Sequence, residues 1–286
     1  MTTRYPRPGL AALAAVCAAA SLALAACSSS SSSDASSSSG TSGTSTPSAG
    51  ASGGTAAAGP KVSGTVVVFA AASLKESFTT LGKDFQTAYP GTNVVFSFGG
   101  SDQLAASITN GAPADVFAAA SPATMKTVTD KGDGAGTPQT FVRNQLEIAT
   151  LPGNPEHIST LKDLTSSKLK VALCAKTVPC GAAAQTALTA SGLKLTPVSY
   201  EQDVKSALTK VELKEVDAAV VYQTDVKAGG SKVQGVDFPE SAKAVNAYPI
   251  DALKNAPNPT GAQAFIALVR STEGQKVLSQ AGFLNP

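Results

Sequence analysis

Two serines follow buried strands that the sequence predicts, and they mark where the chain could bind or react. Ser73 follows the apolar run 66–69, and Ser101 follows the alternating segment 93–98. Each serine comes at the start of a predicted helix, where backbone N–H groups have no partner within the helix. With the positive end of the helix dipole, such groups form an anion site. Ser73 and Glu76 also match a capping box, which stabilises a helix without binding a ligand.

Catalysis needs a poised acid, base or nucleophile, and the sequence offers few candidates. The single histidine, His157, follows a loop-forming Pro-Gly-Asn-Pro stretch. A serine hydrolase with Ser73 or Ser101 as nucleophile would therefore lack its base. Residues 99–103 do not match the nucleophile elbow Gly-x-Ser-x-Gly, and no Gly-rich phosphate loop is present. We predict that the protein is not an enzyme and uses no cofactor, and keep an exported serine hydrolase as a distant alternative.

The N-terminus has the pattern of an export signal. Arg4 and Arg7 precede an apolar run, 10–26, that ends in small residues before Cys27. This order indicates a signal peptide over 1–26. The residues before Cys27 resemble the cleavage motif of bacterial lipoproteins, which implies a lipid on the Cys27 thiol. The alternatives are an ordinary cleaved signal or a membrane-spanning helix, for which about 17 apolar residues is the short limit. We expect a lipid-anchored protein at the extracytoplasmic face of the cell membrane.

The segment 27–60 is almost entirely Ser, Gly, Thr and Ala after its cysteine. It cannot bury apolar surface, so we predict a disordered tether. The folded part is then 61–286, which is enough for one large domain or two lobes. Without Arg4 and Arg7, the 22 basic residues fall to 20 and equal the 20 acidic ones. This balance argues against nucleic acid as a partner.

Strands and helices alternate along the folded part. Predicted strands fall at 66–69, 93–98, 114–119, 140–151, 170–174 and 217–222. Amphipathic or Ala-rich helices lie between and after them, which predicts an α/β fold with mostly parallel strands. The long segment 140–151 suits a crossing between two lobes. Ligands of open α/β sheets bind at the carboxyl ends of strands, and the predicted turns at Ser73, Ser101, Cys180 and Tyr222 share that end.

Two cysteines, Cys174 and Cys180, remain in the folded part, whereas Cys17 leaves with the signal peptide. In an oxidising compartment we expect them to form a disulfide. A zinc site would need more ligands than these two cysteines and one histidine.

Seven short motifs, in order over 64–284, resemble those of the molybdate-binding proteins of bacterial ABC importers. They are Phe-Ala-Ala-Ala-Ser-Leu (69–74), Phe-Gly-Gly-Ser (98–101), Gly-Ala-Pro-Ala-Asp-Val-Phe (111–117), Thr-Val-Pro-Cys-Gly (177–181), Glu-Gln-Asp-Val (201–204), Val-Val-Tyr (220–222) and Ala-Gly-Phe (281–283). The resemblance implies a two-lobed periplasmic-binding-protein fold of type II with two crossing strands as the hinge. The lobes would be 61–141 with 244–286, and 142–243.

The resemblance also implies a set of ligand-binding groups. These are the hydroxyls of Ser73, Ser101 and Tyr222 and the backbone amides of Cys180 and Val204. They would hold molybdate or tungstate, and the protein, a monomer, would deliver the oxyanion to the permease subunits of an ABC importer. The alternatives are a receptor for sulfate or another tetrahedral oxyanion and, further away, a surface adhesin.

Neutral donors favour an anion without a proton, because a proton of phosphate would face an N–H or O–H and find no acceptor. Asp102 and Asp203 could supply such an acceptor if their carboxylates turned inward. Asp102 also departs from the family pattern, in which a small or neutral residue is usual. A disulfide between Cys174 and Cys180, not general in the family, would brace the loop that presents the Cys180 amide.

Overall fold

The computed structural model describes residues 61–286. The predicted signal peptide 1–26, the lipidation site Cys27 and the tether 27–60 lie outside the described residues. Within the described range no helix is long and apolar enough to cross a membrane.

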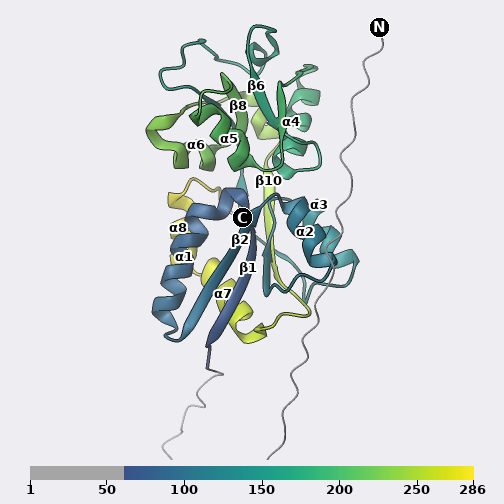
Figure 1. Ribbon diagram of the computed structural model, residues 1–286, viewed down its shortest axis with the longest axis vertical. Helices are drawn as coiled ribbons and strands as arrows, with labels where there is room; N and C mark the ends of the chain where they lie inside the picture. The colour runs from purple at the N-terminus through teal and green to yellow at the C-terminus, as the bar shows by residue number, and fades with distance from the viewer. Residues whose placement is uncertain (1–60) are drawn as a thin grey trace, which may run out of the picture. The chain divides into compact units, whose positions relative to one another are not determined.

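The first lobe is built on a five-stranded sheet in the order β2-β1-β3-β10-β4. Its strands are β1 (Gly64–Ala71), β2 (Thr92–Gly99), β3 (Val116–Ala118), β4 (Gln139–Asn144) and β10 (Asn246–Ala252). Its helices are α1 (Lys75–Ala88), α2 (Ser101–Thr109), α3 (Pro122–Asp130), α7 (Pro259–Arg270) and α8 (Thr272–Gln280). The helices α2 and α3 lie on one side of this sheet, and α1, α7 and α8 lie on the other (Figure 1).

The apolar stripe of α1 explains how this helix is held. Phe78, Leu81 and Phe85 are fully buried, and the rings of Phe78 and Phe85 lie 5.8 and 5.6 Å from that of Phe265 in α7. Burying each such side chain contributes about 1.5–3 kcal/mol. Because α1 follows β1 directly, this packing also fixes the turn that carries Ser73.

The second lobe has a five-stranded sheet in the order β7-β6-β8-β5-β9. Its strands are β5 (Leu146–Thr150), β6 (Val171–Cys174), β7 (Ser199–Glu201), β8 (Ala218–Tyr222) and β9 (Gln234–Val236). Its helices are α4 (Pro179–Ala190), α5 (Val204–Glu212) and α6 (Gln223–Gly229). Short 3-10 turns complete the two lobes: η1 (Ala72–Leu74), η2 (Asp163–Thr165), η3 (Gly230–Lys232) and η4 (Pro239–Lys243).

The α/β class and the expectation of mostly parallel strands are confirmed, because four of the five strands in each sheet run in the same direction and only β10 or β5 runs against them. In each sheet two neighbouring pairs are parallel and two are antiparallel. All antiparallel pairs involve β5 or β10. These two strands enter their sheets after the chain has crossed from the other lobe, so no crossover helix fixes them as parallel.

Two predicted elements divide differently in the structure. The segment 140–151 forms two strands in different sheets, β4 and β5, with Gln145 between them. The apolar spacing within 199–211 predicts a helix, but residues 199–201 form a strand that pairs with β6, and the helix begins only at Val204. The return passage from the second lobe contains β9 and the long strand β10, neither of which the sequence pattern predicted as a strand.

Candidate functional site

All five residues of the predicted ligand set line one small cavity between the lobes. Its volume is about 10 Å³. The five come from five different turns, and their side chains are almost completely buried: Ser73, Ser101, Cys180, Val204 and Tyr222 are each no more than 4 % exposed. The structure therefore brings together every group that the sequence assigned to the site.

Ser73 lies in η1, and the capping box predicted for it with Glu76 is wrong. Helix α1 begins only at Lys75, and its N-terminus has no side-chain cap. The 3-10 turn directs the Ser73 side chain into the interior, where its hydroxyl lies 2.9 Å from the hydroxyl of Tyr248. It is therefore not available to cap the helix.

Ser101 is the first residue of α2, after the N-cap residue Gly100. The first helical hydrogen bond is donated by the amide of Leu104 to the carbonyl of Gly100, so the preceding amides are free of helical partners. The Ser101 hydroxyl accepts a hydrogen bond of 3.0 Å from the amide of Ala120. Its own hydrogen is then free to be donated elsewhere.

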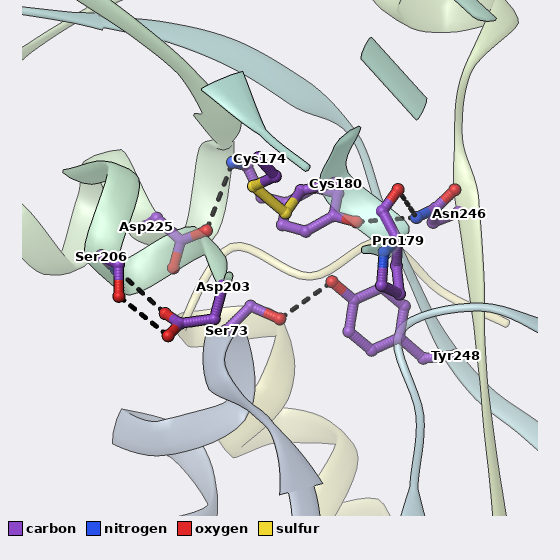
Figure 2. Close-up of a disulfide and its surroundings, with 10 residues drawn as sticks. Ser73, Cys174, Pro179, Cys180, Asp203, Ser206, Asp225, Asn246 and Tyr248 are labelled. Atoms are coloured by element: carbon purple, nitrogen blue, oxygen red, sulfur yellow. Dashed lines mark hydrogen bonds between the residues drawn. A yellow bond between two sulfur atoms is a disulfide. The ribbon is translucent and has the colours of Figure 1, made fainter. Parts of the chain in front are cut away.

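Cys180 lies in the first turn of α4, which begins with a proline at its first position. The amide of Ala182 is the first to bond within the helix, to the carbonyl of Val178. The Cys180 amide consequently has no helical acceptor. The predicted disulfide is confirmed: Cys174, at the end of β6, is bonded to Cys180 with an S–S distance of 2.04 Å (Figure 2). It joins a central strand to the turn that presents this amide.

Val204 is the first residue of α5, and its apolar side chain is core. The preceding Asp203 caps the helix, since its carboxylate accepts from the amide of Ser206 at 2.9 Å and from the Ser206 hydroxyl at 2.8 Å (Figure 2). Asp203 lines the cavity, but both its oxygens are used by the cap. Asp102 does not line the cavity. Of the two carboxylates considered from the sequence, only Asp203 is at the cavity, and its oxygens are directed to Ser206.

Tyr222 ends β8 and is fully buried. Its hydroxyl accepts a hydrogen bond of 2.7 Å from the side-chain amide of Asn246. Burial raises the pKa of Tyr222 well above its ordinary value. The phenol therefore stays protonated and can donate.

An ion-pair cluster lies beside the cavity and joins the lobes. The ammonium group of Lys205 in α5 lies 2.8 Å from Glu76 of α1 and 3.2 Å from Asp225 of α6. Burial raises the pKa of Asp225 to about 6, against the lowering effect of Lys205. A second cross-lobe contact is the hydrogen bond of 2.7 Å from Gln103 to Gln202.

Several residues at the site were not found from the sequence. Tyr248 contacts the hydroxyl of Ser73, Asn246 contacts that of Tyr222, and Asn144 donates to Tyr248. Gly100 meets the backbone of Gln202 from the other lobe. The two asparagines and Tyr248 lie on strands where their spacing gives no sign of a shared site. The only sign in the sequence was a polar residue, Asn144, inside the apolar segment 140–151 that was predicted as one strand.

The fold and this cavity are those of proteins that capture small solutes outside the cytoplasm. The chain matches the family described as bacterial extracellular solute-binding protein over residues 66–284, and it belongs to that family. This is a family of transport proteins rather than enzymes, and it acts outside the cytoplasm.

Individual relatives and solved structures show which members of this family the chain is similar to. The chain is 43 % identical over 222 residues to the molybdate-binding protein ModA of Mycobacterium tuberculosis, covering 78 % of this chain and 85 % of that one. The periplasmic molybdate-binding protein of Azotobacter vinelandii superposes with a TM-score of 0.68 at 20 % identity, covering 77 % and 99 % of the two chains. The sulfate-binding protein SubI of M. tuberculosis superposes with a TM-score of 0.66 at 18 % identity, covering 77 % and 86 %. The last two likenesses concern the fold alone.

Proposed function

We propose that this protein binds molybdate, and also tungstate, in the cavity between its lobes and delivers the anion to the permease subunits of an ABC importer. One observation carries the proposal: three hydroxyls and two helix-start amides, from five separate turns, converge on one buried cavity. The 43 % identity to a molybdate-binding protein supports it. The ligand set is Ser73, Ser101 and Tyr222 through their hydroxyls, and Cys180 and Val204 through their amides.

The hydroxyl and amide donors of the ligand set can balance the negative charge of an oxyanion, so no positively charged side chain or metal ion is needed beside it. Hydrogen bonds to a charged acceptor are roughly twice as strong as neutral ones, and the starts of α2, α4 and α5 add the positive ends of three helix dipoles. The donors contact the oxygens of the anion, so the metal atom arrives as part of the cargo. No protein group needs to ligate it.

The same set disfavours phosphate. The ligand set consists of donors, and the Asp203 carboxylate is engaged with Ser206, so the hydrogen of a protonated phosphate would have to compete with Ser206 for an acceptor. An unpaired buried group costs about 1–3 kcal/mol, which corresponds to roughly 5- to 150-fold in affinity. Sulfate, which carries no proton, is the second candidate, because SubI shares this fold. The sequence identity to a molybdate-binding protein favours molybdate.

Several finer features belong to the same proposal. The protein acts as a monomer without catalysis or cofactor, and a lipid on Cys27 anchors it to the outer face of the membrane. The two lobes move relative to one another about the chain crossings near Gln145 and Val245.

Thermal shift and calorimetry of the purified full chain with molybdate, tungstate, sulfate and phosphate test the ligand. A ligand at 100 times its Kd stabilises the folded state by about 2.7 kcal/mol, which raises the Tm by roughly 5–11 °C for a domain of this size. We expect this shift with molybdate and tungstate. A shift with sulfate or phosphate and none with molybdate would refute the proposal.

A further inference from the structure

The hydroxyls in the cavity each have a hydrogen-bonding partner on the side away from it. Ser101 accepts from the amide of Ala120, and Tyr222 accepts from Asn246. Ser73 pairs with Tyr248 (Figure 2). Since a hydroxyl has one hydrogen, a partner that occupies its oxygen as a donor leaves that hydrogen to point the other way.

The direction of the bond between Ser73 and Tyr248 follows from Asn144. Its side-chain amide donates to the hydroxyl of Tyr248 at 3.2 Å and to that of Thr224 at 2.9 Å. Its carbonyl oxygen accepts from the amide of Gln145, which fixes the end of the side chain that faces Tyr248. Asn144 therefore gives Tyr248 a hydrogen and offers it no acceptor.

Tyr248 must then pass its own hydrogen to Ser73. The ring is fully buried and does not line the cavity. Its hydroxyl lies within hydrogen-bond distance of Ser73 and Asn144, and it also interacts with the hydroxyl of Tyr222, which accepts from Asn246. Burial also raises the pKa of Tyr248, so the phenol keeps its hydrogen. With its oxygen accepting from Tyr248, Ser73 directs its hydrogen into the cavity.

A second series of hydrogen bonds, leading to Tyr222, starts from β10, the strand paired with β4. Asn246 of β10 is the register partner of Asn144 of β4. Its side-chain amide donates to Tyr222 at 2.7 Å and to the carbonyl of Pro179, the residue before Cys180, at 3.3 Å. The two asparagines, which are paired across β4 and β10, therefore support two hydroxyls of the ligand set: Asn144 acts on Ser73 through Tyr248, and Asn246 acts on Tyr222 directly.

We propose that Asn144, Tyr248 and Asn246 are positioning residues that hold the hydroxyls of Ser73 and Tyr222 as hydrogen donors, and that they thereby select an anion that carries no proton. This proposal rests on the proposed function of the cavity. It assigns the selectivity to residues that do not touch the anion.

A double-mutant cycle on the full chain tests it, with calorimetric Kd values for molybdate. Tyr248→Phe keeps the ring and removes only the hydroxyl, and we expect it to weaken binding about threefold to tenfold, the worth of one hydrogen bond. In the Ser73→Ala background the same substitution should change the Kd less than twofold, because the two residues act in series. Tyr89→Phe, a tyrosine far from the cavity, is the control and should bind as the wild type.

Competition with phosphate gives a readout that loose packing would not change. Freed from Tyr248, the Ser73 hydroxyl can turn and accept the hydrogen of a protonated anion. The preference for molybdate over phosphate should therefore fall at least about threefold in Tyr248→Phe.

If the wild type binds molybdate but Tyr248→Phe causes equal losses of affinity in both backgrounds, or no loss in either, the proposed orientation of Ser73 by Tyr248 is refuted. A wild type that binds no molybdate would instead refute the proposed function, and with it the proposed orientation of the hydroxyls. If Tyr248→Phe does not fold, the cycle of Asn246→Ala with Tyr222→Phe decides the same question, since Asn246 is only half-buried.

Discussion

Gly100 lies where the two lobes meet most closely, and replacing it with alanine tests whether this contact permits the cavity to close. Its backbone, with φ −60° and ψ 129°, is one that alanine adopts freely. A methyl group added there would overlap the carbonyl oxygen of Gln202, which belongs to the other lobe. A backbone atom cannot rotate away, so only a movement of the lobes relieves the overlap.

The size of the effect follows from that movement. Ordinary contact between a methyl group and an oxygen requires the two lobes to separate by roughly 1 Å at this point. Val204 lies two residues after Gln202, so its amide would move away from the anion with the same loop. Overlaps of this kind cost about 1–3 kcal/mol, and we expect Gly100→Ala to weaken molybdate binding roughly 5- to 150-fold.

Calorimetry with molybdate measures the loss, and Gly99→Ala is the matched control. A methyl group at Gly99 would meet only the side chain of Leu104, at 3.9 Å. The methyl group would also meet the Asp102 carboxylate of the same lobe at 2.8 Å, but that side chain can rotate away, so the Tm of Gly100→Ala without ligand should stay close to that of the wild type. A normal Tm together with an unchanged Kd would show that closure at Gly100 does not limit binding, and would refute this reasoning.

Three further predictions concern single elements of the site. Ser73→Ala and Tyr222→Phe should each weaken molybdate binding by about 1–3 kcal/mol in calorimetry, and no loss from either would remove them from the ligand set. Replacing Cys174 and Cys180 with serine should lower the unfolding free energy by about 2.4 kcal/mol in the chain-entropy model and should speed molybdate release in stopped-flow measurements; an unchanged off-rate would exclude the bracing role. Because burial raises the pKa of Asp225 from 3.8 to about 6, the folded state holds this proton more tightly than the unfolded state does. The contribution of Asp225 to stability should therefore be largest below pH 4 and should be lost as the pH rises through 6. Urea unfolding from pH 4 to 7 should show this loss in the wild type and not in Asp225→Asn, and parallel curves would contradict it.

The sequence predicted most elements of the fold because their patterns are local. The apolar run before Ser73, the stripe Phe78, Leu81 and Phe85, and the proline after Ser121 each specify an element within a dozen residues. It failed where pairing partners decide the outcome. Residues 199–201 became a strand because the edge of β6 was available, and 140–151 split because its two halves joined different sheets.

The sequence pattern by itself determined the turns at Ser73 and Ser101, since each follows a predicted strand and begins a predicted helix, and the family resemblance added Cys180, Val204 and Tyr222. It could not determine how those donors are oriented. Ser73 bonds to Tyr248, 175 residues away, rather than capping the helix that follows it. Tyr222 depends in the same way on Asn246, and Gly100 meets Gln202 only across the lobes. The reason is physical: the direction of a hydroxyl and the closeness of two lobes depend on atoms that only tertiary folding brings together.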